Sequence, residues 1–216
     1  MDLEILNGNK MKSEELKKFL KKVCDEFVKE LKTGYDELKE NPLYYRERTL
    51  SSYFFPVLMR TSRRALMEVY FEKQNEDEEK LTGRHADFYA LSKEGDISYI
   101  IEFKQAWNEI GAPNELIKKR WDTVNSQIDD LNKENVKKID SGKKIYGISF
   151  MVIPTINKIG KKNKECKEEL DLRFNNELSN AHWSYTWKVS GDIKEGFDED
   201  KFEYLTFVGQ VKNLNR

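Results

Sequence analysis

Between Ser13 and Leu38, apolar residues recur at steps of three and four positions, the spacing of one face of an α-helix. Ser13 suits the start of a helix, and Asn41-Pro42 cannot continue one. The pattern therefore predicts an amphipathic helix over residues 13–38. Its apolar face comprises Leu16, Phe19, Leu20, Val23, Phe27, Leu31, Tyr35 and Leu38.

A second helix is expected from about Tyr45, with a kink or an end near Pro56. Three strand-like segments follow it, at residues 66–73, 85–91 and 97–103. The last two are separated by only five polar residues, which predicts a hairpin. Tyr99-Ile100-Ile101 is an unbroken apolar run, typical of a central strand that is buried on both faces.

The second half of the chain begins with a predicted long helix over residues 114–139, whose inner stripe is Leu116, Ile117, Trp121, Val124, Ile128 and Leu131. Residues 145–153 form the most strand-like segment, which Pro154 should end. A basic stretch over residues 158–167 should lead into a helix through residues 170–178. Two more strands are expected at 183–189 and 202–208.

The predicted order is therefore helix, three strands, helix, strand, with one helix in front and further elements behind. This order indicates an α/β sheet with helices packed on it. At 216 residues, the chain should form a single domain over residues 1–216. It would comprise an N-terminal helix over about 13–39, a core over about 45–155 and a C-terminal extension over about 156–216.

Charge and cysteine content narrow the function classes. The net charge is −1, so any nucleic acid must be met by a local basic patch or by a metal ion. The two cysteines form no metal-binding spacing and no disulfide framework. We find no apolar run of signal-peptide or membrane-spanning length. A cytoplasmic protein without a membrane partner is the expectation.

Three charged residues lie on two neighbouring predicted strands that are otherwise mostly apolar. Glu102 and Lys104 end one strand and, being two residues apart, should share a face, with Phe103 turned to the other. Asp87 lies on the preceding strand. The Glu-x-Lys spacing recurs six times elsewhere, mostly on helical or loop segments where it makes a solvated face. A structural salt bridge at the sheet end is thus the alternative to a functional site.

These residue types suit a divalent metal. Mg²⁺ prefers a few carboxylate oxygens together with waters and substrate phosphate. Asp87 and Glu102 could supply such oxygens, with the carbonyl of Phe103 at the same end, and Lys104 could stabilise charge on a phosphate. A further acid from a helix would complete the set. Glu47 is the first candidate for it, and Glu68, on the first strand, is the second.

This arrangement resembles the PD-(D/E)xK nuclease superfamily, which has the restriction-endonuclease-like fold, over roughly residues 45–155. The resemblance implies an α-β-β-β-α-β core and Mg²⁺ or Mn²⁺ bound by Asp87, Glu102, Phe103 and Glu47. It makes Lys104 the catalytic lysine of DNA hydrolysis and allows a homodimer. This sequence has Ala86 where many members have a proline. The candidate substrate contacts are Arg84, His85, Gln105 and Gln127.

Two other readings stay open. The fold could be kept in a catalytically inactive protein that acts as a binding or regulatory module, which the near-neutral charge favours. The chain could also be a toxin or defence component that cleaves RNA rather than DNA. Measurements of Mn²⁺ binding and of DNA against RNA cleavage would separate the three.

Overall fold

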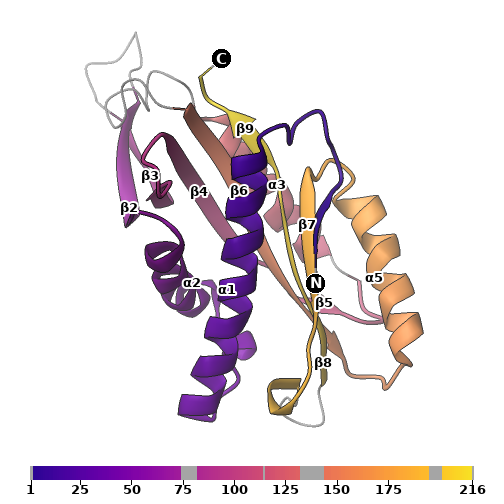
Figure 1. Ribbon diagram of the computed structural model, residues 1–216. Coiled ribbons are helices and arrows are strands. Elements are labelled where there is room, and N and C mark those ends of the chain that lie inside the picture. Colours follow the sequence, from indigo (N-terminus) through magenta and orange to yellow (C-terminus); the bar gives the residue numbers. More distant parts are fainter. Residues whose placement is uncertain (1, 74–81, 114, 132–143, 195–200, 216) are drawn as a thin grey trace.

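The computed structural model describes residues 2–73, 82–113, 115–131, 144–194 and 201–215, which form a mixed sheet flanked by four α-helices (Figure 1). The helices are α1 (Glu14–Leu38), α2 (Glu47–Thr61), α3 (Glu115–Asp129) and α5 (Asn163–Glu177), with short 3-10 turns η1 (Pro42–Tyr44) and η2 (Asp192–Lys194). The strands are β1 (Leu3–Ile5), β2 (Arg64–Lys73), β3 (Thr82–Leu91), β4 (Ile97–Gln105), β5 (Asn108–Glu109), β6 (Lys144–Asn157), β7 (Trp183–Lys188), β8 (Lys201–Gly209) and β9 (Val211–Asn213).

The main path of the sheet runs β1-β7-β8-β6-β4-β3-β2, and β5 and β9 pair with β6 beside that path. Among the described residues, β6 pairs in parallel with β4 and β5, and the other pairings are antiparallel. The predicted order of one helix, three strands, a helix and a strand is confirmed by α2, β2, β3, β4, α3 and β6. As the apolar run predicts, β4 is buried along its whole length.

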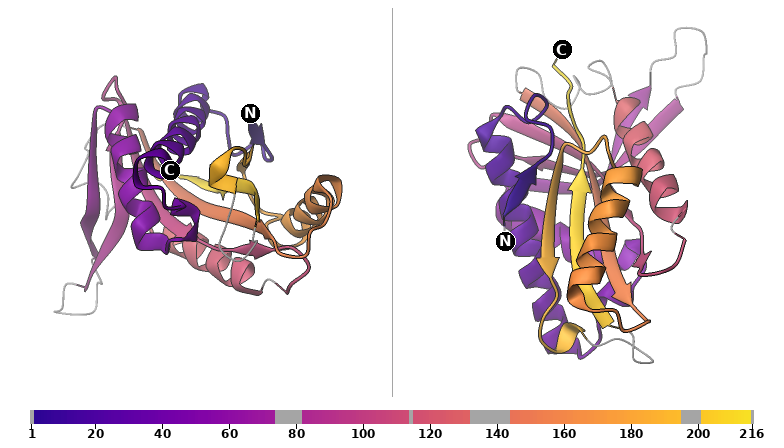
Figure 2. Two further views of the ribbon diagram at one scale, coloured as in Figure 1. Left: turned by 90° about the horizontal axis from the view of Figure 1, so that it is seen from below. Right: turned by 90° about the vertical axis from the view of Figure 1, so that its right-hand side faces the viewer.

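Two helices cover each face of the sheet. Helices α1 and α2 pack on one face, and α3 lies on the other (Figure 2). Helix α5 shares the α3 face, where its Cys166 and Leu170 contact Tyr204 of β8 and Ile110. The C-terminal strands β7, β8 and β9 therefore extend the same sheet, and α5 covers that extension.

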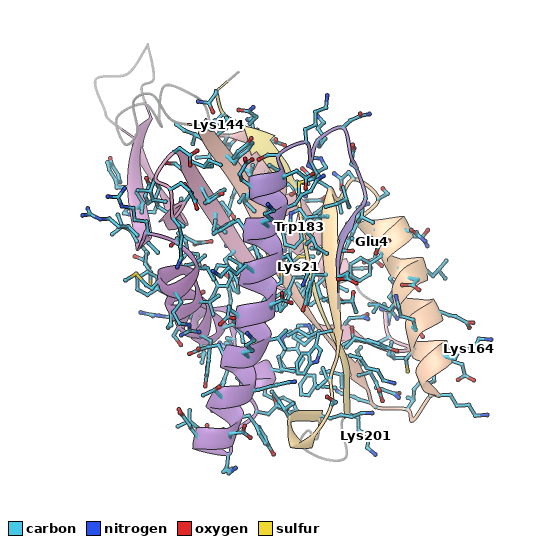
Figure 3. The ribbon with its side chains drawn as sticks, in the orientation of Figure 1. Glu4, Lys21, Lys144, Lys164, Trp183 and Lys201 are labelled. Atoms are coloured by element: carbon cyan, nitrogen blue, oxygen red, sulfur yellow. The ribbon has the colours of Figure 1, made fainter. Side chains whose placement is uncertain are left out.

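The main core lies between the sheet and helices α1 and α2, and it is rich in aromatic rings. Phe54 of α2 is fully buried and contacts rings from α1, β3, β4 and β6 at centroid distances of 4.8–5.2 Å. Trp183 lies inside this layer, whereas Lys164 projects outward from α5 (Figure 3). The alternation of apolar residues in the strands determines which residues reach this core.

Helix α1 begins as its sequence predicts. The Oγ of Ser13 accepts a hydrogen bond from the N–H of Leu16, which caps the first turn. At the other end, Lys39 adopts a left-handed conformation with φ 56° and closes the helix. The sequence pattern predicts Leu38 on the buried face, but Leu38 is 61% exposed because it is the last residue of the helix.

Three further predictions need correction. Helix α3 ends at Asp129, so residues 130–131 are not helical, and the remainder of the predicted helix lies outside the described residues. Leu116 is 49% exposed, and Asn125 occupies part of the buried stripe of that helix. Strand β6 passes through Pro154 to Asn157. Pro154 lies between the last β4 partner, Val152, and the first β5 partner, Thr155, so its missing N–H removes no bond from either pairing.

Helix α5 is tied to the rest of the fold by the carboxylate of Glu169. This group accepts hydrogen bonds from the N–H of Gly111 at 2.8 Å and from Lys161 at 2.9 Å, and it pairs with Arg173. Arg173 in turn donates to Asn108 and to the carbonyl of Ala112. Burial by itself would raise the pKa of Glu169, but these hydrogen bonds outweigh burial and lower the pKa to about 2.

The lowered pKa of Glu169 predicts a loss of stability in acid. Because the pKa is below that of the unfolded chain, the ionised carboxylate contributes its full stabilisation above about pH 5 and loses it as the pH falls toward 2. The contribution should be on the order of 2–3 kcal/mol. Urea unfolding of the wild type and Glu169→Gln at pH 7 and pH 3 measures it. The difference between the two proteins should shrink at pH 3, and a constant difference would contradict the assignment.

Among the described residues, no helix is both long enough and apolar enough to cross a membrane.

Candidate metal and phosphate site

Three oxygen atoms converge on the side-chain nitrogen of Lys104 at the end of β4. Lys104 Nζ lies 3.4 Å from Glu47 Oε1, 3.4 Å from Asp87 Oδ2 and 2.9 Å from the carbonyl oxygen of Phe103. These oxygens come from α2, β3 and β4. The sequence predicts Glu47, Asp87, Phe103 and Lys104 as site residues, and the fold brings them together.

A local parting of two strands places Asp87. Strands β3 and β4 pair from Leu91 opposite Ser98 as far as Phe88 opposite Ile101, and Asp87 follows immediately beyond the last pair. There the carboxylate Oδ2 of Asp87 accepts a hydrogen bond from the backbone N–H of Phe103 at 2.7 Å. The side chain thus takes over a bond that the strand backbone no longer supplies. This bond fixes Asp87 beside Lys104.

The neighbouring strand is distorted at the same level. Met67 pairs with Phe88 and Val69 pairs with Ala86, but no pair joins Glu68 to Asp87. Glu68 has φ 50°, a left-handed conformation that is uncommon for a residue with a side chain. Ala86 and Val69 pack on the α3 side, whereas Phe88 packs on the α1 and α2 side, so the alternation of faces shifts at Asp87. Such irregularities redirect a side chain, here that of Asp87.

Glu47 is positioned by the start of α2. It is the first residue of that helix, and its Oε2 accepts a hydrogen bond from the backbone N–H of Gln105 at 3.1 Å. Its other oxygen, Oε1, faces Lys104. One carboxylate therefore joins the helix start to the strand end. The structure brings Glu47 to Lys104, while Glu68 lies on the distorted edge strand, exposed to solvent.

Glu102 occupies a different environment. Glu102 is only 1% exposed, and it interacts with another group of the protein. In the sheet register, Glu102 lies opposite Ser149 and Lys104 lies opposite Met151, which packs against α3. Within the described part of the chain, no group of three or more histidine, cysteine and acidic side chains could hold a metal ion. A ligand role for Glu102 therefore stays a prediction.

The remaining sequence candidates lie around this strand end or near it in the chain. His85 is exposed, its Nδ1 is 3.2 Å from the carbonyl of Glu68, and its ring meets Tyr70 edge-on. The side chain of Arg84 lies outside the described residues. Gln105 is buried beside Lys104, and its side-chain nitrogen has no partner in the described structure. Gln127 on α3 is half-buried, with its Oε1 similarly unpaired.

Asn125 was not anticipated from the sequence. Its side chain is 7% exposed, and neither its oxygen nor its amide nitrogen has a hydrogen-bond partner among the described residues. It follows Val124, which belongs to the same core cluster as Met151 of β6, on the sheet-facing side of α3. The sequence does hint at this burial, because Asn125 lies four residues after Trp121 and therefore on the same face of the helix. Unpaired buried amides are suited to a polar ligand or water.

The two carboxylates at the end of β4 are open to solvent and could bind a ligand. The Glu47 and Asp87 side chains are 34% and 38% exposed, whereas that of Lys104 is 11% exposed. Two carboxylates and a backbone carbonyl are oxygen donors of the type that Mg²⁺ accepts, and Mg²⁺ commonly keeps several waters. The residues present therefore fit a hard divalent cation. Mg²⁺–oxygen distances are about 2.1 Å, so such an ion would require Lys104 to move aside.

The chain matches no protein-family model, and searches of curated proteins and of solved structures found no match either. The geometry of this strand end is therefore the basis of the functional argument below.

Proposed function

We propose that this protein is a metal-dependent nuclease that hydrolyses phosphodiester bonds, with DNA as its substrate. The observation that carries the proposal is the convergence of Glu47, Asp87 and the Phe103 carbonyl on the ammonium of Lys104. Two half-exposed carboxylates and a lysine at a strand end are the groups needed to hold a cation and a phosphate together.

The order and pairing of the elements support the same proposal. Helix α2 precedes the β2-β3-β4 meander, α3 follows it, and β6 then pairs in parallel with β4. This is the α-β-β-β-α-β arrangement expected for a restriction-endonuclease-like core. The strand distortion at Glu68 and Asp87 supports it further, because irregular backbone is common beside active sites.

Each residue has a defined task in the proposed reaction. Glu47, Asp87 and the Phe103 carbonyl would hold a divalent cation, which supplies Lewis-acid stabilisation to the scissile phosphate. The Phe103 N–H keeps Asp87 oriented through the 2.7 Å hydrogen bond. Lys104 would donate to a phosphate oxygen and stabilise the negative charge that builds up there. Its four-carbon stem lets the ammonium move while the backbone stays in the sheet.

A catalytically inactive binding module is the second candidate. The observation that favours it is that the Lys104 ammonium already forms ion pairs with both carboxylates, at 3.4 Å each. A salt bridge of this kind can complete a sheet end without any metal. The nuclease needs a divalent metal and cleaves its substrate, whereas the binding module needs no metal and cleaves nothing.

Cleavage assays test the proposal directly. Supercoiled plasmid, linear duplex, single-stranded DNA and RNA are each incubated with purified protein and Mg²⁺ or Mn²⁺, with EDTA as the matched control. We expect DNA strands to be cut only when metal is present. Absence of cleavage on every substrate, combined with no Mn²⁺ binding by calorimetry, would favour the inactive module. Cleavage confined to RNA would replace the DNA assignment.

Substitution of Lys104 by methionine separates metal binding from catalysis. The change removes the ammonium that competes for Glu47 and Asp87, so Mn²⁺ should bind about tenfold more tightly or better. DNA cleavage should nevertheless be lost. Calorimetry with Mn²⁺ measures the first effect, and Lys93→Met, an exposed lysine of the β3–β4 turn, is the control. Weaker Mn²⁺ binding in Lys104→Met would show that the carboxylates are not the metal ligands.

A further inference from the structure

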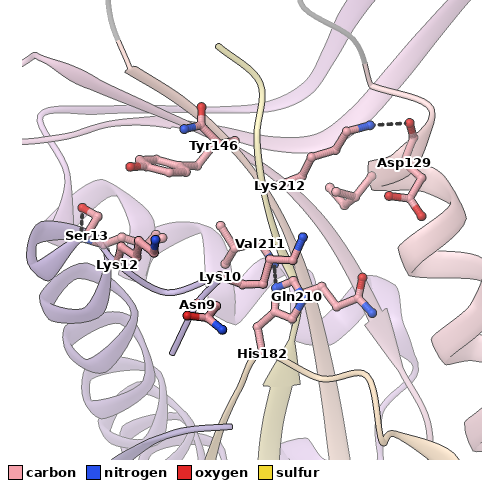
Figure 4. A pocket seen from close by; sticks show the side chains of 13 residues that line it. Asn9, Lys10, Lys12, Ser13, Asp129, Tyr146, His182, Gln210, Val211 and Lys212 are labelled. Carbon is pink, nitrogen blue, oxygen red and sulfur yellow. Dashed lines mark hydrogen bonds between the residues drawn. The ribbon is translucent and has the colours of Figure 1, made fainter. Parts of the chain in front are cut away.

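A polar cavity lies where the N-terminal segment, the sheet and α3 meet. It has a volume of about 420 Å³ and is lined by segments that are far apart in the sequence (Figure 4). Lys10 and Lys12 come from the chain before α1, Tyr146 from β6, His182 from the residue before β7, and Lys212 from β9. This volume is in the range of pockets that hold small organic ligands.

The charge of this cavity is predominantly positive. No ion pair joins Lys10, Lys12 or Lys212 to an acid within the described part of the chain. Lys212 Nζ donates instead to the backbone carbonyls of Asp129 and Leu131, at 2.6 Å and 3.0 Å. These neutral acceptors hold the ammonium at the end of α3 without cancelling its charge. Asp129 is the acid on the lining, against three lysines.

Neutral groups complete the lining. His182 Nδ1 accepts a hydrogen bond from the N–H of Val211 at 2.9 Å, so the other ring nitrogen carries the proton in the neutral imidazole. Tyr146 is half-buried and presents its ring to the cavity (Figure 4). The side-chain amides of Asn9, Gln210 and Asn213 also line it. The cavity thus combines cations, hydrogen-bonding groups and an aromatic face.

This cavity is separate from the acidic site. Tyr146 pairs with Tyr99 on β4, whereas Met151 pairs with Lys104, and both pairs lie along the same parallel ladder. Five residues of strand place them roughly 16 Å apart. The two sites also have opposite chemistry, since one presents carboxylates and the other presents lysines.

We propose that this cavity binds a nucleoside phosphate, with the phosphate held by Lys10, Lys12 and Lys212 and the base lying against the ring of Tyr146. Three lysines line this cavity, which favours a phosphate, because charge-assisted hydrogen bonds are among the strongest in proteins. An aromatic side chain provides a stacking surface for any base. The cavity volume accommodates more than an inorganic anion. This binding is independent of the proposed nuclease activity.

Histidine NMR provides a specific test, because the chain contains only two histidines and the second, His85, lies on β3 outside the cavity. Burial lowers the pKa of His182, the charge of Lys10 lowers it further, and Asp129 acts in the opposite direction. A bound phosphate should therefore raise the pKa of His182, whereas the chemical shifts of the His85 ring should not change. The protein with ¹³C-labelled histidine is titrated with AMP, adenosine, inorganic phosphate and a single-stranded oligonucleotide.

AMP is expected to shift the His182 signals at a concentration at least tenfold lower than inorganic phosphate, and adenosine should have no effect. The double variant Lys10→Ala/Lys12→Ala should weaken AMP binding by at least about tenfold. Lys18→Ala/Lys22→Ala, two exposed lysines of α1 outside the cavity, should bind as the wild type does.

Three outcomes would overturn the proposal. Inorganic phosphate binding as tightly as AMP would remove the role of the base. Binding of the oligonucleotide without binding of AMP would make the cavity part of a nucleic-acid surface. Unchanged AMP binding in Lys10→Ala/Lys12→Ala would show that the lysines hold no phosphate. Metal-dependent DNA cleavage should persist in that variant, so the two proposals fail separately.

Discussion

Asp87→Asn is expected to slow Mg²⁺-dependent DNA cleavage by a factor of about 10² to 10³, the size of effect seen when one preorganised electrostatic group is removed. Asparagine keeps an oxygen that can accept the 2.7 Å hydrogen bond from the Phe103 N–H, so the strand end should keep its shape. What it loses is the negative charge that faces Lys104 and that would bind the cation. Single-turnover cleavage of a labelled duplex measures the effect.

The control for this substitution is Asp122→Asn, which makes the same chemical change at an exposed position on α3. It should cleave DNA at the wild-type rate. Thermal unfolding of both variants establishes that each is folded, so that a loss of rate reports on the site. Wild-type cleavage by Asp87→Asn, with the metal requirement intact, would remove Asp87 from the reaction and leave it as the structural partner of Lys104.

Phe54→Ala should lower the free energy of unfolding by about 3–5 kcal/mol, which is a large fraction of the stability of a typical domain. The Phe54 ring is fully buried and contacts Phe27, Phe88, Phe103 and Phe150, so its removal leaves a cavity among four rings from different elements. Because α2 also carries Glu47 at its first residue, loosening this contact should disturb the metal site as well. Urea denaturation followed by fluorescence measures the stability.

Phe54→Leu is the graded comparison, since leucine fills part of the space and should cost about half as much or less. Phe55→Ala, on the neighbouring and less buried position of α2, should cost less than Phe54→Ala. A small effect of Phe54→Ala, equal to that of Phe55→Ala, would mean that the aromatic layer repacks around the cavity. Mn²⁺ calorimetry on Phe54→Leu shows whether a modest loss of packing reaches Glu47.

Most of the candidate site could be selected from sequence because its residues follow short local rules. A lysine two residues after an acid at the end of an apolar strand, an acid on the preceding strand and an acid at a helix start are each visible locally. Glu47, Asp87 and Lys104 do come together, and the Phe103 carbonyl is beside them. Glu102 shows the limit of such rules, because its burial on the α3 face depends on the packing of a helix that comes later in the chain.

Other features needed contacts between distant segments. Pro154 continues in a strand because it pairs with Leu205 of β8 and lies between the β4 and β5 partners of β6. The left-handed backbone of Glu68 and the shift of faces beside Asp87 arise from the pairing of two strands. The residue types at these positions do not predict either feature. The lysine-rich cavity draws its lining from the N-terminal segment, β6, β9 and α3, so spacing along the chain contains no sign of it.

The sequence by itself determined the succession of helices and strands, the burial of β4 and the identity of the acids and the lysine at its end. These depend on periodicity and on neighbouring residues, which act over a few positions of the chain. Only the tertiary structure decided that the Lys104 ammonium lies among the oxygens of Glu47, Asp87 and Phe103, and that a lysine-rich cavity lies farther along the sheet. The physical reason is that such contacts depend on strand register, strand twist and helix packing, which join residues that the chain keeps far apart.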